Sequence, residues 1–181
     1  MTIRSIFESF NRTLTCLTGF LLLSAANLAA QQGNNDAVNA NIIYHFTKYI
    51  NWPPEKKSKN FVIGIVGETG LYDELKNTTA GKMAGNQNIV IRRYKASAKI
   101  FDCQILFITD EEGGDLKKLV VATTGNPILI VTESEGLAKQ GSCINFVIAD
   151  DHLKLEINKT NIEKRNLNIA SDLLKLGVVV K

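Results

Sequence analysis

The 181-residue sequence has few of the residues that usually build catalytic or metal centres: two histidines, three cysteines and one tryptophan. His45 and His152 have no neighbouring His or Cys at the spacing of metal ligands, so we expect no metal site. The G-x-S-x-G nucleophile elbow is absent, and Gly81-Lys82 lacks the rest of a phosphate-binding Walker loop. We therefore expect a protein that is not an enzyme and that uses no cofactor.

Charge of one sign is not concentrated anywhere in the chain. The 21 Lys and Arg residues nearly balance the 18 Asp and Glu residues, which leaves a net charge of +3. The densest basic run, residues 55–59, is short and typical of a solvated loop. Because a nucleic-acid-binding surface needs clustered Lys and Arg, we expect no nucleic-acid partner. The composition, 45% hydrophobic and 22% charged, is that of an ordinary globular domain.

Long hydrophobic runs are missing except near the N-terminus. Residues 14–26 form an apolar run that follows Arg4 and Arg12, and Ala29-Ala30 precede Gln31. This order is typical of a secretory signal peptide with its cleavage site. The run is shorter than the roughly 20 residues that span a membrane, and an uncleaved anchor is the alternative. We predict a signal peptide over residues 1–30 and a single exported domain over residues 31–181.

The exported part alternates between helical and strand-like patterns. Apolar spacing predicts a helix from residue 35 or 36 to Ile50, which ends before Trp52-Pro53-Pro54. Apolar runs of strand length and a further helical segment follow at residues 61–66, 89–94, 103–108, 116–122 and 127–131. The fold class that this predicts is α/β, Rossmann-like or flavodoxin-like, with a mostly parallel sheet and flanking helices.

Residues 143–158 depart from this alternation and predict a C-terminal β-hairpin that turns near Asp150-Asp151. When Ala149 pairs with His152, every residue on one face is apolar, which favours this register. The same register places Asn145 opposite Glu156 on the other face. This pair either is a structural hydrogen bond of the hairpin or belongs to a polar patch that binds a ligand or a partner.

Three glycines lie at the end of the first predicted strand and just after it, at the place where α/β sheets bind phosphate groups. Gly64, Gly67 and Gly70 are spaced G-x-x-G-x-x-G, whereas the dinucleotide fingerprint is G-x-G-x-x-G. Arg92-Arg93 stand where that fingerprint expects an acidic residue. We interpret the glycines as turn residues.

Two cysteines remain after removal of the signal peptide, and each begins an apolar run. In an oxidising compartment Cys103 and Cys143 are a candidate disulfide. Two buried free thiols are the alternative, because the sequence does not give the distance between the two Cα atoms.

The single tryptophan belongs to a corner at the end of the first predicted helix. Trp52, with Tyr49 and Pro53, either packs in the core or anchors a protein interface, where Trp and Tyr are favoured. These three residues, with Asn145 and Glu156, are our candidates for partner binding.

Several segments together resemble the YfiR-like proteins. The opening helix, residues 37–53, ends on a Trp-Pro pair, and the resemblance continues through residues 103–108, 128–133, 136–147, 155–158 and 170–176. It implies a periplasmic α/β domain that binds the periplasmic part of a membrane diguanylate cyclase or a sensor kinase and represses it. By the same resemblance, this repression controls the level of cyclic di-GMP and, through it, biofilm formation. The resemblance also implies a possible homodimer and sequestration by an outer-membrane lipoprotein.

Two functions remain to be compared. The first is a periplasmic regulatory protein that acts by protein–protein contact, which we expect. The alternative is a periplasmic small-molecule-binding module that uses the crevice at the carboxyl end of the sheet, near residues 67–70.

Overall fold

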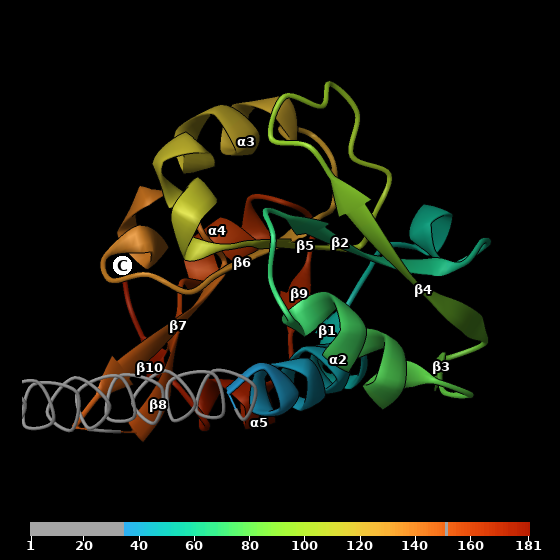
Figure 1. Cartoon of the computed structure of the whole chain (residues 1–181), viewed down its shortest axis with the longest axis horizontal. Helices are drawn as coiled ribbons and strands as arrows, with labels where there is room; N and C mark the ends of the chain where they lie inside the picture. The colour runs from blue at the N-terminus through green and yellow to red at the C-terminus, as the bar shows by residue number, and fades with distance from the viewer. Residues whose placement is uncertain (1–34, 151) are drawn as a thin grey trace, which may run out of the picture.

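The computed structural model describes residues 35–150 and 152–181 (Figure 1). The signal peptide predicted for residues 1–30 lies outside the described residues. No helix in the described part of the chain combines the length and hydrophobicity needed to cross a membrane.

Eight strands form one sheet in the order β10-β8-β7-β6-β5-β2-β4-β3. Five of them, in the order β4-β2-β5-β6-β7, pair in parallel. The first of these five in the chain therefore lies between the second and the third, which is the flavodoxin-like strand order. The bounds of the eight strands are β2 Phe61–Val66, β3 Met83–Ala84, β4 Gln87–Tyr94, β5 Ile105–Ile108, β6 Leu129–Thr132, β7 Ile144–Ala149, β8 His152–Ile157 and β10 Val178–Val179.

Helices cover both faces of this sheet, which explains why β2, β5 and β6 are buried along their whole length. The N-terminal helix (residues 35–49) and α2 (Leu71–Thr79) lie on one side in Figure 1, and α3 (Leu116–Ala122) lies on the other. Right-handed crossovers require helices on opposite faces, because β4 and β5 lie on opposite sides of β2 in the sheet. The chain moves in one direction from β2 to β4 and in the opposite direction from β4 to β5. The predicted α/β class and mostly parallel sheet are confirmed.

The C-terminal hairpin is also confirmed, in the predicted register. Ala149 pairs with His152, and Asn145 pairs with Glu156. Ile144, Phe146, Leu155 and Ile157 are buried on the predicted apolar face. Near the turn the hairpin extends beyond the core, so Ile148 of the same face is 63% exposed.

A two-stranded ribbon joins the end of the N-terminal helix to the C-terminal part of the chain. β1 (Ile50–Asn51) continues directly from the N-terminal helix and pairs antiparallel with β9 (Asn168–Ile169). The amide of Ala170 also donates a hydrogen bond to the carbonyl of Tyr49 at 2.8 Å. The remaining elements are short: the 3-10 turns η1 Pro54–Lys56, η2 Asp110–Asp115 and η3 Leu137–Gln140, and the helices α4 Lys159–Glu163 and α5 Ser171–Leu174.

Both described cysteines are buried and carry free thiols. Cys103 leads into β5 and Cys143 leads into β7, and β6 lies between these strands. Two strand spacings amount to about 10 Å, which exceeds the roughly 7 Å between Cα atoms that a disulfide spans. Burial raises the pKa of Cys103 to about 12 and that of Cys143 to about 11, which makes both thiols poor nucleophiles. The topology therefore favours the free-thiol alternative.

Candidate functional site

The residues singled out in the sequence lie at opposite ends of the parallel strands. Tyr49, Trp52 and Pro53 lie at the amino end, next to the starts of β2 and β5, because Trp52 contacts Phe61 and Gln104. Asn145 of β7 and Glu156 of β8, here called the hairpin pair, lie at the carboxyl end, where β6 finishes. The fold thus gathers the first three residues and separates them from the hairpin pair.

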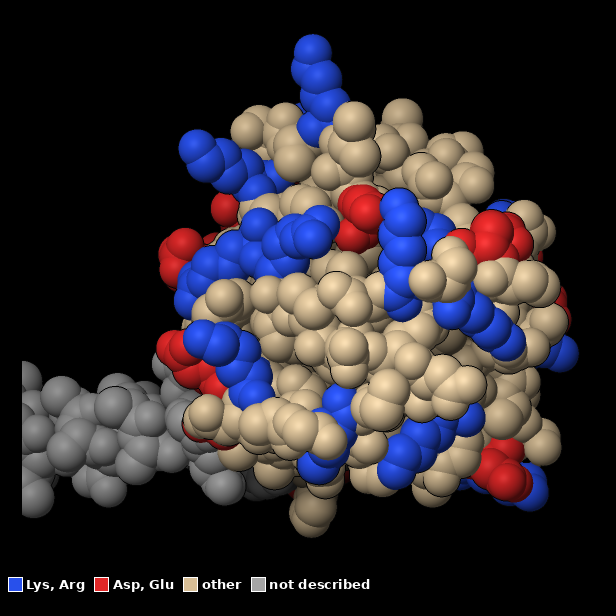
Figure 2. Space-filling model, turned by 90° about the vertical axis from the view of Figure 1, so that its right-hand side faces the viewer, with Lys and Arg blue, Asp and Glu red and all other residues tan. Residues whose placement is uncertain are grey.

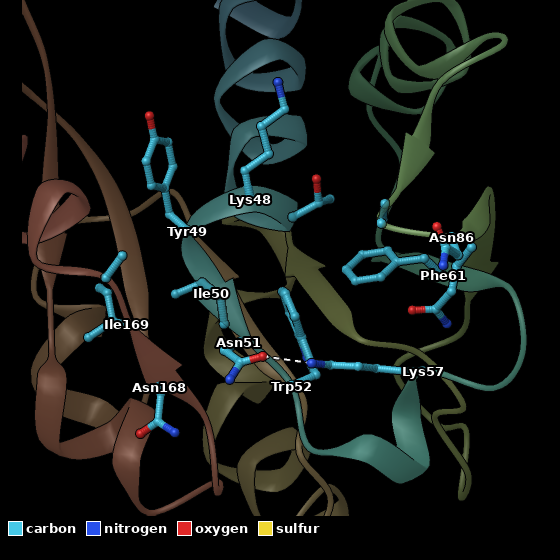
Figure 3. A pocket seen from close by; sticks show the side chains of 15 residues that line it. Lys48, Tyr49, Ile50, Asn51, Trp52, Lys57, Phe61, Asn86, Asn168 and Ile169 are labelled. Carbon is cyan, nitrogen blue, oxygen red and sulfur yellow. Dashed lines mark hydrogen bonds between the residues drawn. The ribbon is translucent and has the colours of Figure 1, made fainter.

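A cavity of about 670 Å³, here called the amino-end pocket, opens beside the Trp52 corner (Figure 3). The end of the N-terminal helix, β1, the start of β2, the β3–β4 turn and β9 supply its walls. Its 15 lining residues include Lys48 and Lys57 but no Asp or Glu. Lys57 donates a hydrogen bond to the side chain of Asn51 at 2.8 Å, and the side chains of Asn86 and Asn168 are exposed on the same rim.

Trp52 forms the floor of this pocket. It is only 4% exposed, its ring meets that of Phe61 edge to face with centroids 4.9 Å apart, and its Nε1 donates to the carbonyl of Gln104 at 3.2 Å. These contacts are those of a core residue. Tyr49 and Pro53 are only half-buried, so they present surface beside the tryptophan.

Lysines and arginines are more abundant than acidic residues on the neighbouring face over β3 and β4, although they are scattered (Figure 2). Lys82, Arg92 and Arg93 are exposed there. Ammonium groups and side-chain amides donate hydrogen bonds, and none of the 15 described lining residues has a carboxylate that would compete for them. The amino-end pocket is therefore suited to an acidic or carbonyl-rich segment.

The hairpin pair is part of a buried network. Asn145 is fully buried, and its Oδ1 accepts hydrogen bonds from the Thr132 hydroxyl at 2.7 Å and the Ser134 amide at 3.2 Å. Its Nδ2 donates to the Ser134 carbonyl at 2.8 Å and to Glu156 at 2.9 Å. These four bonds use the capacity of the amide side chain. Asn145 thus ties the hairpin to the end of β6, while half-buried Glu156 remains partly accessible.

A second cavity, of about 610 Å³, lies at the carboxyl ends of the parallel strands and is here called the carboxyl-end pocket. Thr69 lines it after β2, Asp110 after β5 and Glu133 after β6, and Asp36 and Asn39 line it from the N-terminal helix. It contains no Lys or Arg among its described lining residues. The crevice expected near residues 67–70 thus has acidic walls.

Two of these acidic side chains have raised pKa values. Burial raises the pKa of Glu133 to about 7, with further contributions from Asp36 and Asp110, although the Asp110 amide donates a hydrogen bond to it. Burial and the nearby Glu74 also raise the pKa of Asp36, against a hydrogen bond from Thr69. Asp36, Asp110 and Glu133 were not among the residues singled out in the sequence. A signal for this cluster was present, because Asp110 and Glu133 each follow the end of a predicted strand.

The two glycines after β2, Gly67 and Gly70, lie where a side chain would collide with a neighbouring residue. Gly67 has φ of +99°, and a Cβ there would lie 2.1 Å from the Thr109 hydroxyl oxygen. A Cβ on Gly70 would lie 2.6 Å from a carboxylate oxygen of Asp36. A carboxylate therefore already occupies the space where a bound phosphate would approach α2, which agrees with the interpretation as turn residues.

Among residues 35–150 and 152–181, no three His, Cys, Asp or Glu side chains are grouped closely enough to hold a metal ion.

A family model described as YfiR/HmsC-like matches residues 36–178. This range begins in the N-terminal helix and ends in β10, so it contains nearly the whole described sheet and every lining residue of the two pockets except Asn35. No curated protein sequence matches the chain.

Proposed function

Because the chain belongs to the YfiR/HmsC-like family, we propose that it represses a membrane-bound diguanylate cyclase by binding the periplasmic part of that enzyme. Family membership by itself supports a periplasmic regulatory role in cyclic di-GMP signalling, and family members are regulators rather than catalysts. Our proposal goes beyond family membership in three respects: the identity of the partner, its repression and the effect on biofilm formation. The alternative partner is a membrane sensor kinase, bound in the same way through its periplasmic part.

The observation that carries the proposal is the amino-end pocket. Two lysines and three exposed asparagines surround an aromatic floor with no carboxylate among the lining residues. Interfaces derive much of their binding energy from Trp, Tyr and Arg around a desolvated centre, and charged residues at the rim attract a partner of opposite charge. We propose that an acidic segment of the partner binds across Tyr49 and Pro53, with its carboxylates at Lys48 and Lys57. Glu156, outside this pocket, is then a secondary contact that Asn145 holds in place.

Two further assemblies belong to the same proposal. One is a homodimer, supported by Val178 and Val179, which are 55% and 54% exposed on the edge strand β10. The other is capture by an outer-membrane lipoprotein, which would release the cyclase by competing for the repressor. Processing of residues 1–30 as a signal peptide is required for each of them.

The test is a pull-down from membranes with the tagged full chain expressed and exported to the periplasm. We expect it to recover a membrane diguanylate cyclase or sensor kinase. The double variant Lys48→Glu with Lys57→Glu should reduce recovery about tenfold or more, because it turns attraction into repulsion. The control is Lys117→Glu with Lys139→Glu, which makes the same charge change at two exposed lysines outside the pocket.

Equal recovery with both double variants would refute the amino-end pocket as the contact surface. Recovery of no cyclase or kinase, from membranes shown to contain them, would refute the repressor proposal itself. In that case the small-molecule-binding module becomes the better account, supported by the carboxyl-end pocket.

A further inference from the structure

We propose that the carboxyl-end pocket binds a small organic amine, a protonated primary amino group attached to an apolar body. This site is separate from the amino-end pocket, so the inference does not depend on the proposed repression.

The place of the pocket in the fold is the first argument. Chain segments leaving β2 and β5 turn to opposite faces of the sheet, and in open α/β sheets this divergence creates the crevice where ligands bind. Thr69 and Asp110 line the pocket from these two segments, and Glu133 lines it from the neighbouring β6. Its volume of about 610 Å³ lies within the usual range of small-molecule sites.

The charge of the pocket decides the sign of the ligand. Sites at this position commonly use the helix N-terminus to bind an anion. Here the carboxylate of Asp36 lies against Gly70, the residue before α2, and so occupies that position itself. Asp110 and Glu133 add two more carboxyl groups, and none of the described residues that line the pocket is a Lys or Arg that would offset them. An anionic ligand would be repelled, whereas a cation would be attracted.

A buried atom without a partner is the second, independent argument. Asn39 lines the pocket from the N-terminal helix and is 6% exposed, yet its Oδ1 receives no hydrogen bond from the described residues. Leaving a buried acceptor unpaired is costly, and a ligand donor that reached it would remove this cost. A primary ammonium carries three N–H donors, one for Asn39 and two for the carboxylates of Asp36 and Glu133.

The remaining wall requires an apolar body on the ligand. Val38 and Ile148 line the pocket although they are 43% and 63% exposed, and Phe146 and Leu153 complete this side. Burying these side chains against a ligand is favourable in proportion to the apolar area covered. A bare metal ion would leave that wall uncovered, and the described carboxylates are not grouped for metal coordination. The raised pKa of Glu133 agrees with an acidic pocket that lacks its counter-charge.

The experiment uses the protein purified from the periplasm after expression of the full chain, with binding followed by calorimetry and by NMR shifts of backbone amides. Four probes separate the arguments: benzylamine, benzoate, methylamine and magnesium chloride. We expect saturable binding of benzylamine, with shifts at Asp36, Thr69 and Glu133. Benzoate should not bind because of its charge, and methylamine should bind at least about tenfold more weakly because it lacks the apolar body.

Variants then assign the site. Glu133→Gln and Asn39→Ala should each weaken benzylamine binding about tenfold. Glu135→Gln should leave it unchanged, since Glu135 is exposed two residues away and does not line the pocket. Circular dichroism of each variant checks that it is folded. Absence of benzylamine binding, equal binding of benzoate, or shifts caused by magnesium alone would each overturn the proposal.

Discussion

The two pockets are similar in size but opposite in chemistry. Among the lining residues that the structure describes, the amino-end pocket has two lysines and no carboxylate, while the carboxyl-end pocket has three carboxyl groups and no Lys or Arg. One described element lines both of them: the N-terminal helix contributes residues 35–39 at one end and 47–49 at the other. At 1.5 Å per residue, Asn39 and Lys48 lie about 14 Å apart along its axis. A single helix can therefore present a cation-attracting and an anion-attracting surface because its ends lie at opposite edges of the sheet.

The pockets also differ in how they are held together. The amino-end pocket rests on the packing of one buried aromatic residue, Trp52, whereas the carboxyl-end pocket adjoins the polar network of Asn145. Truncating a buried aromatic residue leaves a cavity, whereas truncating a residue of a polar network leaves hydrogen-bonding groups unpaired, and the first usually costs more stability. The comparison predicts a larger loss of stability at the amino end, and three variants test it.

The largest effect is expected for Trp52→Ala. Removing this buried side chain leaves a cavity beside Phe61 and should lower the free energy of unfolding by about 3–5 kcal/mol. The measurement is urea-induced unfolding of the purified protein. The control Trp52→Phe keeps a ring in the core and should cost clearly less. A loss below about 1 kcal/mol for Trp52→Ala would show that the amino-end pocket does not depend on this residue.

An intermediate effect is expected for Asn145→Ala. The substitution removes the hydrogen bonds that Asn145 makes with the backbone of Ser134 and leaves the Thr132 hydroxyl with only its bond to Ser142, so it should cost about 2–3 kcal/mol in the same unfolding measurement. Glu156→Gln is the matched control, because its side-chain oxygen still accepts the hydrogen bond from Asn145. If Asn145→Ala cost no more than the control, the network would not stabilise the hairpin.

The smallest effect concerns pH. The pKa of Glu133 is about 7 in the folded protein and 4.5 as its ordinary value, so the folded state binds the proton more tightly. Stability should therefore fall as pH rises from about 4.5 to about 7, since burial next to Asp36 and Asp110 disfavours the ionised form. Because Glu133 is only half-buried, solvent screening should keep the change well below the roughly 3 kcal/mol that the full shift corresponds to. Glu133→Gln should reduce this slope in denaturation measured across the pH range, and Glu135→Gln should preserve it. An unchanged slope in Glu133→Gln would refute the assignment.

Much of the fold was predictable from local pattern. The apolar spacing of the first helix predicted an end at Ile50, and the described helix ends one residue earlier. The hairpin register was correct because a shift by one residue would have moved every apolar side chain to the other face. The ribbon of β1 and β9 was not predicted, because two-residue strands are too short to show periodicity.

The candidate sites were predictable only in part. Trp52 stood out as the single tryptophan and Asn145 through its cross-strand partner Glu156, so composition and register were sufficient to find them. Asn39 and Glu133 did not stand out. An asparagine in a helix and a glutamate after a strand are common, and nothing local shows that one would face the other across a cavity.

By itself, the sequence determined the alternation of strands and helices, the hairpin register and the membership in the family, because each depends on the spacing of residues along the chain. The tertiary structure alone decided which polar residues meet. Asp110 and Glu133 are far apart in sequence and converge because parallel strands share one direction, so that the segments following them emerge at the same edge of the sheet. The start of the N-terminal helix brings Asp36 to the same place. Lys48, at the end of that helix, and Lys57, just before β2, lie at the opposite edge, so the fold carries two pockets of opposite charge.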